Sequence, residues 1–388
     1  MNIIIAMLIL GIIVFIHELG HFTFAKIFKV PVREFSIGMG KRIFSFVKGK
    51  TRYSLKILPF GGSCAMVGED IAGTGDFTAE GGVLDKEKNE VDFDGVRYSV
   101  DEIEQNNFSV ISPIKKAVIC LSGPLFNIVL GSICSIIIVV MIGTTKPIIN
   151  NVVVNSPAEK AEPYSLQVGD EIMELSTYGS KQKIRLSDEI SLFMYLNNDL
   201  FEKEDTPLSV KIKRDNQILD TLVYPKINET EKRVMIGIGL GELYRPKNLF
   251  EIIKNGIYEV LFYIDSTIKS LRLLIAGKFS ANEISGPIGT VAVMGGAIKE
   301  ATSVKTIILM ILSFMSLISV NLAVMNLIPI PALDGGRILE AGIEMIIGHR
   351  LNEKIITVIN AVSMGLLLLL MMWIFGMDIY KVLIGAYR

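Results

Sequence analysis

Two of the chain's three histidines lie in one short motif, His17-Glu18-Leu19-Gly20-His21. Residues four positions apart on an α-helix share a face, so His17 and His21 can offer two imidazoles to one metal ion. Glu18 lies beside them, where its carboxylate can serve as a general base. The pattern is that of a zinc hydrolase. The alternative is a chance match, which is rare in a chain with so few histidines.

The composition places this motif in a membrane protein with soluble parts. Half of the residues are hydrophobic, only 20% are charged, and the mean hydropathy is +0.48. The net charge of -1 and the lack of a long basic tract give no reason to expect nucleic acid as a partner. Three scattered cysteines without a CxxC motif argue against a disulfide framework or a cysteine metal site. The N-terminus has neither a basic region nor a small-residue cleavage site, so we expect the first helix to stay in the mature protein.

Four apolar runs predict transmembrane helices, because each supplies the roughly 20 residues that a bilayer core requires. They cover residues 1–28, 113–143, 304–336 and 354–377. The first run contains His17, Glu18 and His21, and ionisable groups at such a depth indicate a functional site. Between Lys26 and Lys56 the chain has nine Lys or Arg against one acid, Glu34, which predicts a cytoplasmic segment. The N-terminus and the segment after the second span then lie outside the cell.

The segments between the spans differ in character. Residues 29–68 alternate as a strand does and predict a membrane-associated β-hairpin or small sheet on the cytoplasmic side, with an ordinary surface hairpin as the alternative. Residues 69–112 predict an acidic, solvated and partly disordered cytoplasmic loop. Residues 148–241 alternate short β-rich runs with one helical stretch and predict a small extracytoplasmic domain. Residues 248–276 predict an amphipathic helix at the membrane surface, or else a core helix of that domain.

A second unusual stretch, residues 326–337, lies at the end of the third apolar run. Pro329 and Pro331 cannot continue an α-helix, and Asp334-Gly335-Gly336 permits a tight turn. The first and third spans run in the same direction, so Asp334 reaches a depth similar to that of the two histidines. As a third ligand it would leave the fourth position of a zinc site to water, whose proton Glu18 could accept. Taken alone, Asp334 could equally cap the following helix.

Several motifs together resemble the site-2 protease family of intramembrane zinc metalloproteases, peptidase family M50. These are the histidine motif, Gly123-Pro124-Leu125-Phe126-Asn127, and the stretch from Asn326 to Gly336, together with Phe60-Gly61-Gly62 and Ser285-Gly286-Pro287-Ile288-Gly289. The resemblance implies that His17, His21 and Asp334 bind Zn²⁺ and that Glu18 is the general base. It also implies that Asn326 assists the substrate or the oxyanion, and that the hairpin presents the substrate as an extended strand.

The middle of the chain is similar to the PDZ domain of the bacterial members that act in regulated intramembrane proteolysis. The similar stretches are Ser156 to Ala161 and Leu166 to Ile172, with Glu162-Pro163-Tyr164-Ser165 in place of the usual glycine. The implied fold is a polytopic α-helical protein of the bacterial plasma membrane with four transmembrane helices, a membrane-associated β-hairpin and one inserted extracytoplasmic PDZ-like α+β domain.

The resemblance implies an active site toward the cytoplasmic side of the lipid bilayer. Expected substrates are single-span membrane proteins, such as anti-sigma factors or remnant signal peptides, cut after a separate first-cut protease.

Two other functions fit parts of the pattern. His17, Glu18, His21 and Asp334 could form the cation pathway of a transporter, but transport predicts further ionisable residues along the other spans, and few are present. The chain could also be an inactive membrane scaffold built around the PDZ-like domain. The intact histidine motif and Asp334 argue against that interpretation.

Overall fold

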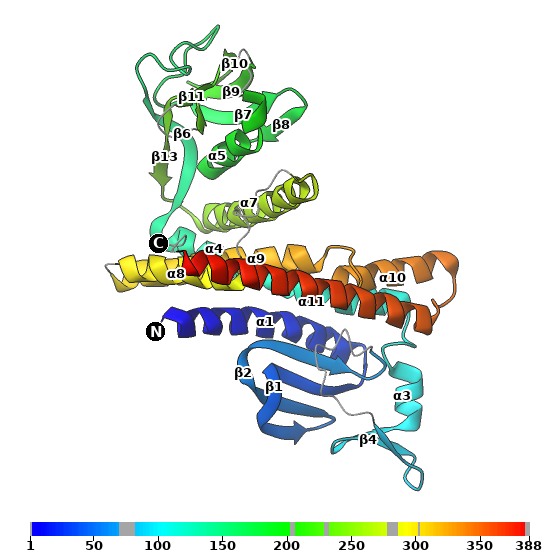
Figure 1. The fold of residues 1–388 in the computed structure, drawn as a ribbon. Helices are drawn as coiled ribbons and strands as arrows, with labels where there is room; N and C mark the ends of the chain where they lie inside the picture. The colour runs from blue at the N-terminus through cyan, green and yellow to red at the C-terminus, as the bar shows by residue number, and fades with distance from the viewer. Residues whose placement is uncertain are drawn as a thin grey trace. The chain divides into compact units, whose positions relative to one another are not determined.

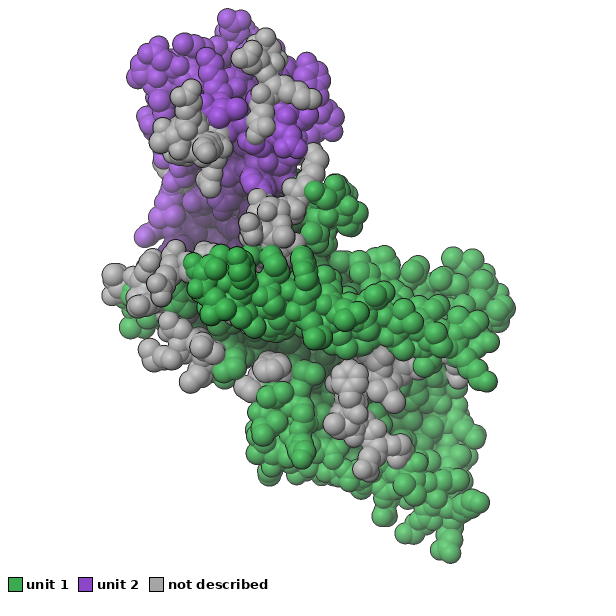
Figure 2. Space-filling model, in the orientation of Figure 1, with its two compact units in different colours: residues 1–134, 267–388 green, residues 135–266 purple. Residues whose placement is uncertain are grey.

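The computed structural model describes residues 2–69, 82–201, 206–228, 233–277, 286–301 and 303–384. They form two compact units, one of residues 1–134 and 267–388 and one of residues 135–266 (Figure 2). The boundaries between the units fall inside two helices, α4 (Pro113–Ile142) and α7 (Leu249–Ile275).

Four of the described helices are long and apolar enough to cross a membrane, which confirms the prediction of a polytopic membrane protein. They are α1 (Asn2–Ile27), α4, α9 (Val304–Asn326) and α11 (Glu353–Leu383) (Figure 1). Two boundaries differ from those predicted. The third helix ends at Asn326 rather than at residue 336, because Pro329 and Pro331 interrupt it, and the fourth continues to Leu383 rather than to residue 377.

A short helix, α8 (Pro287–Glu300), packs against α1, α9 and α11. Met294 of α8 is buried together with Ala6, Ile9 and Ile13 of α1. Asp378 of α11 accepts hydrogen bonds from the backbone N–H groups of Gly286 and Gly289 and so satisfies the start of α8. The first half of α1 is therefore held by apolar packing, while its second half carries the histidine motif.

The predicted hairpin is present as β1 (Val32–Lys48) and β2 (Thr51–Met66). Its strands bend over each other, so residues 34–37 have residues 62–65 on one side and residues 52–55 on the other. Gly38, Gly40 and Gly61 take positive φ angles at the bends. The outer part of the hairpin leaves many apolar side chains exposed, namely Ile43, Phe44, Phe46, Val47, Leu55, Ile57 and Leu58.

The prediction of a partly disordered loop is wrong for residues 83–106, although most of their side chains are exposed or half-exposed, as a solvated segment requires. They form a three-stranded antiparallel sheet of β3 (Val83–Asp85), β4 (Glu90–Phe93) and β5 (Val96–Ser99), followed by α3 (Val100–Asn106). Two of these acids pair with bases of the hairpin: Asp94 with Arg42, and Glu102 with Lys50. Residues 70–81 of the predicted loop lie outside the described residues.

The second unit is an α+β structure. Its sheet has the order β10–β9–β7–β6–β13, and β8 pairs with β7, while β11 and β12 form a separate hairpin. The strands are β6 (Thr144–Val152), β7 (Glu171–Thr177), β8 (Ser180–Lys183), β9 (Leu208–Arg214), β10 (Gln217–Val223), β11 (Lys226–Asn228), β12 (Arg233–Met235) and β13 (Ile238–Tyr244). The helices α5 (Ser187–Leu196) and α6 (Asn198–Phe201) supply Ile190, Phe193 and Phe201 to the apolar core of this unit.

One buried ion pair stabilises the second unit at the start of β7. Asp170 is 1% exposed, and its two carboxylate oxygens accept hydrogen bonds of 2.7 and 2.8 Å from Arg214 of β9. The same carboxylate accepts the backbone N–H of Gln167 at 2.8 Å. These bonds compensate for the burial of the charge and fix the turn that leads into β7.

Candidate metal centre

The structure brings together the three predicted metal ligands. Nε2 of His17 lies 3.1 Å from Oδ2 of Asp334, and Nε2 of His21 lies 3.4 Å from Oδ1 of the same carboxylate. The two Nε2 atoms are 3.1 Å apart. Both histidines are buried. Two residues of α1 and one residue of α10 (Asp334–Ile347), 313 positions beyond His21 in the chain, thus meet at one point.

The spacing of these atoms fits one zinc ion. Zinc binds imidazole nitrogen at about 2.0–2.1 Å in tetrahedral sites, which places neighbouring ligand atoms about 3.3 Å apart. The two imidazole nitrogens, and each imidazole nitrogen and its nearer Asp334 oxygen, are 3.1 to 3.4 Å apart, which is close to that value. One ligand atom from each of the three residues lies within 4.8 Å of the other two. Three protein ligands leave one position open, as in catalytic zinc sites.

Hydrogen bonds from α4 orient the imidazoles. Nδ1 of His21 donates to the carbonyl oxygen of Ile119 at 2.8 Å, so its Nε2 carries the lone pair that a metal needs. Nδ1 of His17 lies 3.3 Å from the side-chain amide of Asn127, which is fully buried. Among the described residues, Oδ1 of Asn127 has no hydrogen-bond partner. Rotating the amide by 180° lets Oδ1 accept the Nδ1–H of His17, and this also leaves the Nε2 lone pair of His17 directed at the metal position.

Two glycines allow α1 and α4 to approach this closely. A Cβ on Gly20 would lie 2.4 Å from the carbonyl oxygen of Ser122. A Cβ on Gly123 would lie 2.4 Å from Nε2 of His21 and 2.9 Å from Cε1 of His17. The Gly123 backbone therefore forms a wall of the metal site that no larger residue can replace without moving an imidazole.

The turn between α9 and α10 positions Asp334 and Asn326. The helix α9 is joined to α4 by Ser316 and Ser319, which donate to the carbonyl oxygens of Gly131 and Asn127, each at 2.9 Å. At its end, the amide nitrogen of Asn326 lies 3.2 Å from Nε2 of His17. Asp334 is the first residue of α10, and the N-cap position belongs to Leu333, whose side chain makes no capping bond. The carboxylate of Asp334 lies against the imidazoles, so the helix-capping alternative is not what the structure shows.

A cavity of about 140 Å³ opens at the metal group. The side chains of His17, Glu18, His21, Asn326 and Asp334 line it, as do Cys64, Met66, Glu69, Cys120 and Arg337. Cys64 and Met66 belong to β2, and a Cβ on Gly62 of the same strand would lie 3.2 Å from Cγ of Glu18. Among the described residues, the strand partner of residues 62–66 is β1 on one side only. Strand β2 thus passes beside Glu18 with one face of Gly62. No described strand pairs with the second edge of residues 62–66, which we call the open strand edge, although Ser63, Cys64, Ala65 and Met66 are buried.

Comparison with known proteins agrees with this geometry. The sequence model of peptidase family M50 matches residues 5–370 of the chain. The chain belongs to peptidase family M50. It is 30% identical to a protein of Clostridium acetobutylicum with the provisional name zinc metalloprotease, and the match covers 95% of each chain. It is 28% identical to the zinc metalloprotease RasP of Geobacillus kaustophilus, over 96% of each chain. A third relative, from Clostridium perfringens and also provisionally named a zinc metalloprotease, is 30% identical over 98% of each chain.

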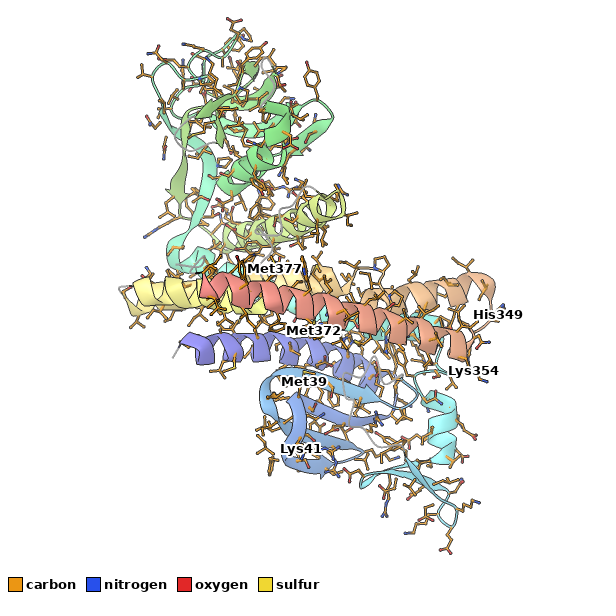
Figure 3. All side chains as sticks on the ribbon, in the orientation of Figure 1. Met39, Lys41, His349, Lys354, Met372 and Met377 are labelled. Carbon is orange, nitrogen blue, oxygen red and sulfur yellow. The ribbon has the colours of Figure 1, made fainter. Side chains whose placement is uncertain are left out.

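The third histidine is remote from this site. His349 is exposed in the connection between α10 and α11, where Figure 3 labels it beside Lys354. Its Nδ1 lies 3.0 Å from the carbonyl oxygen of Arg350. Of the three histidines, the two with helical spacing are the buried pair that faces Asp334.

Gly123 and Asn127 lie against the two histidines. The sequence placed both in one of the motifs that resemble the family, but it assigned neither a role. A Gly-Pro pair and an asparagine within an apolar span need a protein partner at membrane depth, and this signal predicts that the second span packs on the first. Arg337 and Glu69, which also line the cavity, gave no such signal, because one follows a turn motif and the other begins an acidic stretch.

Proposed function

We propose that this chain is an intramembrane zinc metalloprotease in which His17, His21 and Asp334 hold the metal. One observation carries the proposal: ligand atoms of His17, His21 and Asp334 meet beside Glu18. Glu18 and both histidines belong to α1, which is long and apolar enough to span a membrane. Membership of peptidase family M50 and the zinc metalloprotease names of the relatives support it.

The chain's own residues supply the proton transfer and the polar contacts. Zinc, when bound, supplies a Lewis acid that lowers the pKa of a coordinated water to about 7. Glu18 accepts a proton from the attacking water and returns it to the leaving amide nitrogen. The side-chain amide of Asn326 donates a hydrogen bond to the carbonyl oxygen, on which negative charge develops. Glu18 and Asn326 both line the cavity that contains the metal group, so they can reach the same scissile bond.

The substrates in this proposal are single-span membrane proteins, such as anti-sigma factors or remnant signal peptides. A helical substrate must unwind before its amide bond can reach the metal, and an unwound segment can pair with the open edge at residues 62–66. Cys64 and Met66 of this strand line the cavity and Gly62 lies against Glu18, so a strand added at this edge would lie close to the cavity. The exposed apolar side chains of the hairpin, such as Phe44 and Ile57, suit contact with lipid.

The orientation and the order of cleavage are also proposals. The basic segment between Lys26 and Lys56 supports a cytoplasmic hairpin in a bacterial plasma membrane, which places the N-terminus and the second unit outside. The second unit is then an extracytoplasmic PDZ-like domain that admits substrates already trimmed by a separate first-cut protease. Its α+β architecture supports that assignment.

The test is cleavage of a reconstituted single-span substrate by wild type and by Glu18→Gln, with bound zinc measured in both. We expect Glu18→Gln to keep the metal and to lose at least about a hundredfold in rate, since general acid-base catalysis contributes about 10²–10⁴-fold. His349→Ala is the matched control, because it removes the exposed histidine and should cleave as wild type does. Equal rates for wild type and Glu18→Gln would refute the proposed role of Glu18.

A further inference from the structure

A buried ion pair forms part of the wall of the metal-site cavity. The guanidinium of Arg337 pairs with the carboxylate of Glu69, and their side chains are only 10% and 4% exposed. Arg337 lines the metal-site cavity of about 140 Å³ and also an adjacent cavity of about 160 Å³, so its side chain lies in the wall between the two. Neither residue is a proposed zinc ligand, and the proposed chemistry uses neither charge.

Glu69 is tied to the end of the open strand edge. Its second carboxylate oxygen lies 3.3 Å from the backbone nitrogen of Met66, the last residue of β2. The turn that carries Glu69 is held from both sides: Val67 N–H donates to Pro31, and its carbonyl accepts from Phe108 N–H at 2.8 Å. Displacement of Glu69 would therefore move the end of residues 62–66.

Arg337 is tied to the metal ligand. It lies three residues after Asp334 on α10, so the two side chains share one face of the helix. Its guanidinium also lies over the ring of Phe108, 5.6 Å from the centroid. The ion pair thus joins the helix that supplies a metal ligand to the strand edge that passes beside Glu18.

We propose that Glu69 and Arg337 are positioning residues that hold the strand edge at residues 62–66 in register with the metal group. This inference rests on the proposed function. A substrate strand added to the edge takes its position from β2, while the metal takes its position from α1 and α10. The bond to be cut meets the metal only if β2 and α10 are fixed relative to each other. The Glu69–Arg337 pair links them, because Glu69 follows β2 and its carboxylate accepts the backbone N–H of Met66.

The test compares two double variants in the full chain, with a reconstituted single-span substrate. Glu69→Gln/Arg337→Met removes both charges together and so leaves no unpaired buried charge. Lys116→Met/Glu344→Gln is the matched control, because that pair is also buried, has an N–O distance of 2.9 Å and includes a residue of α10, but it joins α10 to α4 rather than to β2. We expect the first variant to raise KM about tenfold or more, with kcat and zinc content within about twofold of wild type. The control should keep all three values within about twofold.

Arg337→Lys supplies the conservative variant. This single substitution retains the positive charge opposite Glu69, so we expect its KM to stay within about threefold of the wild-type KM. A wild-type KM in the Glu69→Gln/Arg337→Met variant overturns the inference. An equal rise of KM in the two double variants also overturns it, because that result indicates general loosening of α10. Loss of zinc from the Glu69→Gln/Arg337→Met variant overturns it as well, because that result indicates a role in metal binding. Failure of the proposed function is distinct, because wild type itself would then leave the substrate intact.

Discussion

Gly123→Ala tests whether the close approach of α4 to the histidines sets the metal site. The added Cβ would lie 2.4 Å from Nε2 of His21, about 1 Å inside the shortest ordinary contact of 3.4 Å. The imidazole cannot turn away freely, because its Nδ1 donates to the Ile119 carbonyl at 2.8 Å. Zinc–ligand distances tolerate only about 0.2 Å of deviation, so a displacement of about 1 Å removes His21 as a ligand.

The expected result is a loss of at least about a hundredfold in zinc affinity, or about 2.7 kcal/mol, since even indirect disturbance of a ligand costs 10–100-fold. The assay is competition for zinc against a chelator of known affinity, on purified protein. Gly365→Ala is the matched control, because it lies in α11 and its Cβ would meet no atom within 4 Å. A Gly123→Ala protein that binds zinc as tightly as Gly365→Ala would refute this account of the wall.

Three further predictions concern other parts of the chain. Asn127→Ala removes the partner of His17 Nδ1 and should weaken zinc binding about tenfold or more in the same chelator assay, whereas unchanged affinity would show that the amide does not orient the ring. Asp170→Ala should lower the free energy of unfolding of the second unit by about 2–3 kcal/mol, measured by urea titration. This loss is smaller than the 3–5 kcal/mol expected when one partner of a fully buried ion pair is removed, because the Arg214 side chain is 22% exposed. Burial and the nearby Asp188 raise the pKa of Glu259 to about 7. A raised carboxyl pKa stabilises the folded form at low pH, so the second unit should lose stability as the pH rises from about 4.5 to above 7, and Glu259→Gln should remove that pH dependence.

The spans and the cluster of His17, His21 and Asp334 could be predicted from signals in the sequence. Apolar length identifies a membrane helix, and a spacing of four places His17 and His21 on one face. The position of Asp334 near the histidines could be predicted because the charges around the spans indicate that the first and third helices run in the same direction. The prolines at 329 and 331 also marked the break after α9, although not the helix α10 that begins at Asp334.

The features that were missed depend on contacts between distant segments. The acids between residues 83 and 106 suggested a loop. Asp94 and Glu102 instead pair with bases of the hairpin, and local composition does not predict such pairings. The ion pair between Glu69 and Arg337 joins residues far apart in the chain, so the local sequence around either residue does not predict it. Gly123 was part of a recognised motif, but its specific role follows from the imidazole rings that lie against it.

The central claim is that His17, His21 and Asp334 bind one zinc ion, and zinc X-ray absorption combined with metal analysis tests it most directly. The account predicts one zinc per wild-type chain, with two imidazole nitrogens at about 2.0–2.1 Å and oxygen in the remaining positions. Asp334→Ala should lose most of the metal under the same purification. Full zinc content in Asp334→Ala with an unchanged spectrum, or sulfur at about 2.3 Å from Cys64 or Cys120, would contradict it.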